Sequence, residues 1–82
     1  MNQRLKLVAK IRNNPRGVRF QDALKVARWL GFVHVGGSGS HRAYSRTGES
    51  TLLNFQKSRA GKIPEYQAQQ LIVMVDKYED EL

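Results

Sequence analysis

The chain predicts a small α+β fold in which two helices, three antiparallel strands and a final helix follow one another. Three observations predict it. The 82 residues are 40% hydrophobic, enough for one domain with a small core. The apolar periodicity changes from helical to strand-like at residue 32, and turn residues separate the short strands that follow. We expect the helices to cover one face of the sheet and to leave the other face open.

The first two helices are predicted by their apolar spacing. Residues 4–12 carry one apolar line, and this helix ends before Pro15 because a proline disfavours helical geometry in the residue ahead of it. The second helix is better defined, since apolar side chains recur at helical spacing from Phe20 to Leu30. Gly31 follows where a left-handed cap is expected.

The strands and the last helix follow from the remaining pattern. Three short β-rich runs are expected, at 32–35, 42–46 and 51–55. A glycine- and serine-rich loop at 36–40 and a turn at 47–50 separate them, so the strands should form an antiparallel meander. Pro64 opens the last helix, at a position where its missing N–H costs nothing.

The net charge is +7, and it is unevenly distributed. Residues 76–82 form an acidic tail with four acidic side chains and one basic, whereas the first 75 residues carry thirteen basic side chains against three acidic. The resulting positive field attracts phosphates, acidic proteins or anionic membranes, and nucleic acid is the interpretation that we favour.

Composition also excludes several classes of protein. Without cysteine the chain has neither a disulfide nor a thiolate metal site, and its two histidines and scattered carboxylates do not predict a zinc site. We therefore expect no metal and no cofactor. The first thirty residues contain no apolar run typical of a signal peptide, and no segment approaches the length of a membrane span. A cytoplasmic protein without a membrane partner is the expectation.

The loop at 36–40 draws attention because of the residue that follows it. A nucleotide-binding loop is disfavoured, since no Gly-Lys-Ser/Thr follows and the next element is a strand. We interpret the loop as a flexible connection that presents His41, a residue type suited to proton transfer near neutral pH. Strand alternation sends His41 and Arg42 to opposite faces, although the sequence does not say which face is open. His34 lies within an apolar strand, and we interpret it as structural.

These residues resemble a known family. The motif that carries the resemblance is Gly39-Ser40-His41-Arg42-Ala43-Tyr44. It is similar to the Gly-Ser-His-x-x-aromatic signature of HicA-type toxins, the mRNA interferases of type II toxin–antitoxin systems. The resemblance covers roughly residues 16–80. Residues 30–35 look like the helix end and first strand of the family, and 52–56, 61–62 and 66–71 look like its third strand and last helix.

The resemblance implies a double-stranded-RNA-binding-domain-like fold for the single domain 1–82, with His41 as the catalytic residue. It further implies mRNA as the substrate and a HicB-like antitoxin as the protein partner. The extra N-terminal helix within 1–15 and the acidic tail at 76–82 lie outside the family's motifs. The sequence leaves the oligomeric state open, with a monomer favoured.

RNA can be cut without a metal, because its 2′-OH can attack the adjacent phosphate. That reaction needs a base, an acid for the leaving oxygen and donors for the charged transition state. We interpret His41 as the acid or base and Ser40 as a hydroxyl that orients a phosphate. The residues expected to bind substrate and to stabilise charge are Arg42, Arg46, Lys57, Arg59 and Lys62. No second proton-transfer group is evident from the sequence.

Two other interpretations stay open at this point. A non-catalytic RNA- or DNA-binding module would use the same basic loop for phosphate contacts and would tolerate loss of His41. A protein-interaction domain would instead use its basic face to meet an acidic partner. The nucleic-acid-binding module does not explain a histidine placed at the end of a glycine loop.

Overall fold

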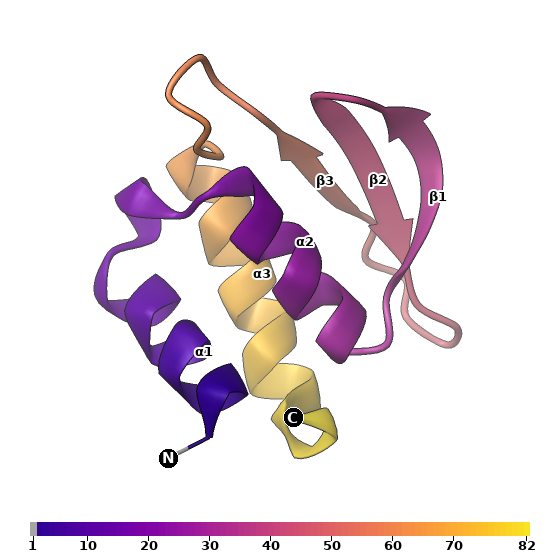
Figure 1. The fold of residues 1–82 in the computed structure, drawn as a ribbon. Helices are drawn as coiled ribbons and strands as arrows, with labels where there is room; N and C mark the ends of the chain where they lie inside the picture. Colours follow the sequence, from indigo (N-terminus) through magenta and orange to yellow (C-terminus); the bar gives the residue numbers. More distant parts are fainter. Residues whose placement is uncertain (1) are drawn as a thin grey trace.

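The computed structural model describes residues 2–82. The predicted α+β fold is confirmed: a three-stranded antiparallel sheet is covered on one face by helices (Figure 1). The helices and strands are α1 (Gln3–Asn13), α2 (Phe20–Trp29), β1 (Val33–Ser38), β2 (His41–Ser45), β3 (Leu53–Gln56) and α3 (Glu65–Tyr78). Short 3₁₀ helices follow α1 (η1, Pro15–Gly17) and α3 (η2, Glu79–Glu81).

The helix boundaries follow local rules. The side chain of Asn2 accepts a hydrogen bond from the Leu5 amide at 2.8 Å and so caps the start of α1. At the end of α2, Gly31 adopts a positive φ of 87°, and the Phe32 amide donates back to the Ala27 carbonyl at 3.0 Å. This reversal turns the chain directly into β1. α1 packs against α2 and α3 (Figure 1).

The sheet has the order β1-β2-β3, so β2 is the central strand. Its register places Ser38 of β1 and Gln56 of β3 opposite His41. The pairing of β1 with β2 shifts between His34 and Gly36, which leaves Val35 as a bulged residue. Both the β1–β2 turn and the β3–α3 loop lie at the upper end of the molecule in Figure 1.

The prediction of a five-residue flexible loop at 36–40 is wrong. Gly36, Gly37 and Ser38 belong to β1 and pair with β2, and only residues 39–40 form the turn. The chain can follow this path because Gly37 and Gly39 take positive φ values of 74° and 61°, which side chains rarely allow. The predicted β2 and β3 boundaries also move, by one or two residues.

The core lies between the sheet and the helices. Tyr44 of β2 and Phe55 of β3 are each 1% exposed and meet edge to face, with ring centroids 5.9 Å apart. From α3, Leu71 and Val75 enter the same cluster. Ile72 is only half-buried. Among the described helices, none combines the length and the apolar character that crossing a lipid bilayer would require.

Candidate functional site

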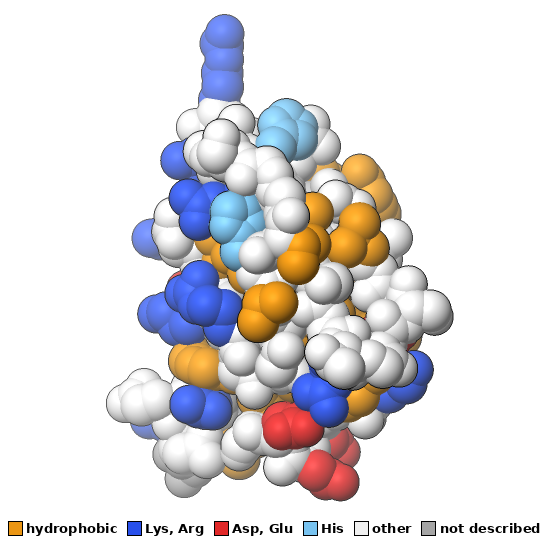
Figure 2. Space-filling view, turned by 90° about the vertical axis from the view of Figure 1, so that its right-hand side faces the viewer, with side chains coloured by type: hydrophobic (Ala, Val, Ile, Leu, Met, Phe, Trp, Pro, Cys, Tyr) orange, Lys and Arg blue, Asp and Glu red, His pale blue; other side chains and the backbone are white. Residues whose placement is uncertain are grey.

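His41 is the first residue of the central strand, and its side chain lies on the open face of the sheet. Tyr44 in β2 and Leu53 opposite it are fully buried against the helices, so the alternate positions of β2 face away from them. His41 is one of these positions and is exposed. Figure 2, which views the right-hand side of Figure 1, shows histidine side chains in its upper half and acidic side chains at its lower edge.

A hollow of about 440 Å³ adjoins His41. The polar and charged residues among those that line it are His41, Arg42, Asn54, Gln56, Tyr66 and Gln67. Residues from β2, β3 and the first turn of α3 therefore meet here. Of these, the sequence predicts only His41 and Arg42 as site residues.

Gln67 connects the elements around the hollow. It is a buried polar residue, 3% exposed, and its Oε1 accepts a hydrogen bond from the Gln56 amide at 2.9 Å. Its Nε2 donates to the Tyr66 hydroxyl at 3.1 Å. Gln56 belongs to β3 and lies opposite His41 of β2. Through its two bonds, Gln67 therefore holds the Tyr66 side chain in place relative to β3. The signal for it in the sequence is a polar residue on the apolar stripe of α3, four positions before Leu71.

His34 supports the strand end rather than entering the hollow. Its Nε2 lies 2.8 Å from the Gly36 carbonyl oxygen and 2.9 Å from that of Gly37. Its ring lies 5.5 Å from the ring of Tyr44. These contacts hold Gly36 and Gly37 of β1 in place beside β2, which is a structural role. The His34 side chain is nevertheless exposed.

Four of the predicted basic residues lie at the His41 end of the sheet. Arg42 is half-buried, and its Nε donates to the Gly39 carbonyl at 3.3 Å. The Lys57 amide donates to the Ser40 carbonyl at 2.8 Å, which ties the β3–α3 loop to the turn before His41. The same loop carries Arg59 and Lys62, both exposed. The loop and the turn form one end of the molecule (Figure 1).

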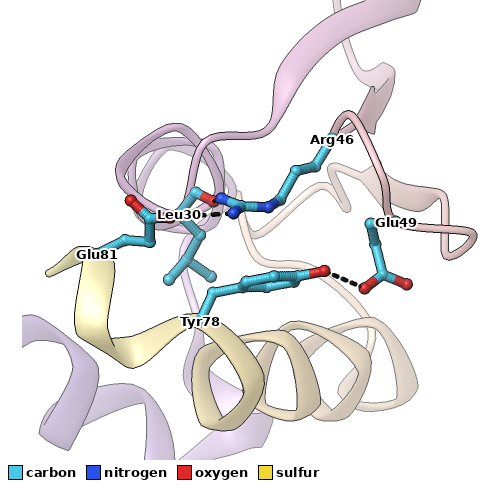
Figure 3. A network of polar contacts seen from close by, with 5 residues as sticks. All are labelled: Leu30, Arg46, Glu49, Tyr78 and Glu81. Atoms are coloured by element: carbon cyan, nitrogen blue, oxygen red, sulfur yellow. Dashed lines mark hydrogen bonds and ion pairs between the residues drawn. The ribbon is translucent and has the colours of Figure 1, made fainter.

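Arg46 is placed elsewhere. Its guanidinium donates to the Leu30 carbonyl, pairs with Glu81 at 3.0 Å and lies 3.9 Å from the centre of the Tyr78 ring (Figure 3). Only 21% of its side chain is exposed. The structure therefore does not bring Arg46 to His41. The Arg46 side chain instead joins the end of β2 to the C-terminal end of α3.

Glu49 completes the polar network at that end. Its side chain is 2% exposed and receives hydrogen bonds from Lys77 at 2.7 Å, from the Tyr78 hydroxyl and from the Thr51 amide at 2.8 Å. The bond from Lys77 and then that from Tyr78 lower the pKa of Glu49 from 4.5 to about 2. The same carboxylate raises the pKa values of Lys77 and Tyr78. These groups hold the β2–β3 connection against α3.

The acidic tail neutralises cations at this end of the protein and not at the other. Asp76 pairs with Arg12 at 2.5 Å, and Glu79 lies 3.9 Å from the same guanidinium. Within residues 2–82, the ion pairs include none of the four predicted cations near His41. Those cations are therefore available to an external anion.

The described part of the chain contains no group of three metal-ligating side chains close enough to hold an ion. The polar groups gathered around the hollow beside His41 come from an exposed histidine, a tyrosine and two glutamines, one buried and one exposed, and four cations without an ion-pair partner among residues 2–82 lie at the same end of the sheet. In comparisons with known proteins, no family model, no curated protein and no solved structure matches this chain.

Proposed function

We propose that this chain is a metal-independent endoribonuclease, the toxin of a toxin–antitoxin system, and that it cleaves mRNA through His41. The observation that carries the proposal is the position of His41. It is exposed, on the open face of the sheet and next to a polar hollow, at the end where the cations have no ion-pair partner among residues 2–82. The resemblance of residues 39–44 to the HicA-type signature supports mRNA as the substrate and a HicB-like antitoxin as the partner.

In the proposed reaction the 2′-OH of one nucleotide attacks the adjacent phosphate. His41 takes the proton from that hydroxyl, and the leaving 5′-oxygen receives a proton as the bond to phosphorus breaks. Arg42 and Lys57 stabilise the negative charge that develops on the phosphoryl oxygens, while the Ser40 hydroxyl orients the phosphate. The products are a 2′,3′-cyclic phosphate and a 5′-OH.

We assign the second proton transfer to Tyr66. Its hydroxyl accepts a hydrogen bond from Gln67 Nε2, so its own proton remains free to be donated. Tyr66 and His41 both line the hollow, and Gln67 bonds to the Tyr66 hydroxyl and to the amide of Gln56, the residue opposite His41. Tyrosine is among the side chains that act as general acids.

The test of the proposed function is RNA cleavage by the purified chain in the presence of EDTA. His41→Ala is expected to lower the rate about 10²- to 10⁴-fold, the usual contribution of a general acid or base. The thermal unfolding midpoint should stay unchanged, because the side chain is exposed. Full cleavage by His41→Ala, or cleavage only with added Mg²⁺, would contradict the proposal. RNA binding without any cleavage by the wild type would favour the non-catalytic module.

The role of Tyr66 has a separate test. Tyr66→Phe should slow cleavage of ordinary RNA but not of a substrate whose leaving 5′-oxygen is replaced by sulfur, because a thiolate leaves without being protonated. His41→Ala should slow cleavage of both substrates. If Tyr66→Phe slows both to the same extent, Tyr66 is not the acid.

A further inference from the structure

A second groove lies beside the His41 end, between the start of α2 and the β3–α3 loop. It has a volume of about 500 Å³, and the charged residues that line it are Arg19, Asp22, Lys57 and Lys62. Three of these four charges are positive, and none of the three cations takes part in an ion pair with any described residue. Arg19 was not selected from the sequence.

Arg19 and Lys62 are held directly opposite each other. They form an antiparallel β-bridge, flanked by the bond from the Phe20 amide to the Gly61 carbonyl at 2.9 Å and the bond from Ile63 to Val18 at 3.0 Å. Because these bonds flank the pair, their Cβ atoms lie about 5 Å apart on the same side of the bridge.

The bridge places two like charges on neighbouring positions of an antiparallel pair. Like charges placed directly opposite in an antiparallel pair repel each other. The bridge cannot relax by sliding apart, because the neighbours Val18, Phe20 and Ile63 are at most 3% exposed and belong to the core. An anion bound between the two side chains would remove the repulsion.

Lys57 connects the groove to the turn that precedes His41. The Lys57 amide donates to the Ser40 carbonyl, directly before the histidine, while the Lys57 ammonium lies 5.7 Å from the centre of the Phe20 ring at the start of α2. Lys57 thus spans the space between His41 and the bridge. The Lys57 backbone bonds to the turn before His41, and its side chain reaches the groove.

We propose that this groove binds phosphates of the RNA strand next to the bond that is placed at His41. The inference rests on the proposed function, since it assigns the groove to the same substrate. A guanidinium beside two ammonium groups suits the phosphodiester backbone, where Arg19 can bind two oxygens at once. Because backbone contacts carry no sequence information, the groove contributes affinity and register rather than base preference.

The test measures binding in the His41→Ala background, where cleavage is expected to be at least about 100-fold slower. The probe is a fluorescent single-stranded 12-nucleotide RNA, titrated at several KCl concentrations. Arg19→Gln with Lys62→Gln should weaken binding about tenfold and lower the slope of log affinity against log salt by about 0.7 for each lost contact. The control pair is Arg28→Gln with Lys6→Gln, two exposed cations outside the groove that remove the same charge.

Each result decides the inference. An equal loss of affinity in both pairs would show that only net charge matters and would overturn it. Unchanged affinity in Arg19→Gln with Lys62→Gln would also overturn it, while leaving cleavage by His41 untouched. If a poly-glutamate peptide binds through Arg19 and Lys62 as tightly as the RNA does, the groove serves an acidic protein and the assignment to phosphates fails.

Discussion

The two ends of the sheet treat charge in opposite ways. At the end where β2 leads into β3, Glu49 and Arg46 are largely buried, and each bonds to groups on or next to α3. At the end that carries His41, the cations of the β3–α3 loop face solvent without an acidic partner in the described chain. The first arrangement holds the fold together, and the second leaves its charges for a ligand.

The difference shows why the type of residue alone does not identify a binding residue. Arg42 and Arg46 lie four positions apart in and after one strand, and from the sequence both were assigned to the substrate. In the structure Arg46 belongs to the paired end, whereas Arg42 lines the hollow beside His41. Pairing inside the protein, rather than charge, separates the two.

The largest effect is expected from a change at the His41 end, Gly37→Ala. A Cβ on Gly37 would lie 2.3 Å from the His41 carbonyl oxygen, and the backbone there has a positive φ. The hairpin must therefore move, and His41 with it. We expect a loss in the free energy of unfolding well above the 1–2 kcal/mol or so that a left-handed alanine costs alone, together with a large fall in RNA cleavage. Urea unfolding and cleavage rates measure the two effects.

Gly39→Ala is the matched control in the same hairpin. Gly39 also has a positive φ, but a Cβ there would meet nothing within 4 Å. This variant should lose about 1–2 kcal/mol and keep most of its cleavage activity. If the two variants prove equally stable and equally active, the close approach of β1 to His41 does not fix the histidine.

A smaller effect is expected at the paired end, from Glu49→Gln. The substitution removes the charge that Lys77 and Tyr78 stabilise, so the free energy of unfolding should fall at neutral pH while RNA binding stays unchanged. A carboxyl group whose pKa is lower in the folded than in the unfolded state stabilises the fold at pH values above the pKa that it has in the unfolded chain. The advantage of the wild type should thus be complete above about pH 4.5 and be lost as the pH falls towards 2.

Glu65→Gln provides the comparison for that experiment. It removes the same charge from an exposed pair with Arg16 at 3.1 Å, where the arginine side chain is 82% exposed. We expect less than about 1 kcal/mol from it. Urea unfolding at pH 7, 5 and 3 separates the cases. Equal losses in the two variants would show that the Glu49 network adds nothing to an ordinary surface pair.

The fold could be predicted because local sequence patterns indicate most of its helices and strands. The apolar spacing from Phe20 to Leu30, followed by Gly31, determines α2 and its cap without reference to the rest of the chain. The loop at 36–40 could not be predicted, since glycine and serine favour a loop until β2 and the His34 ring supply partners for their backbone. Pairing across strands outweighed local preference.

The candidate site was only partly predictable for a related reason. His41 could be found from its motif and Lys57 from its basic loop. Gln67, Tyr66 and Arg19 enter through contacts between segments distant in sequence, such as the bond from Gln56 to Gln67 and the bridge from Arg19 to Lys62. Composition and periodicity contain no information about those contacts.

The contacts of His34 have a consequence for how the hairpin responds to acid. Both partners of its Nε2 are carbonyl oxygens, which only accept, so this nitrogen must carry a proton in the neutral ring. Adding a second proton at Nδ1 leaves the same N–H pointing at the same oxygens. The brace therefore survives a change in the charge of its own ring. The hairpin that carries His41 thus keeps this brace in either charge state of the His34 ring.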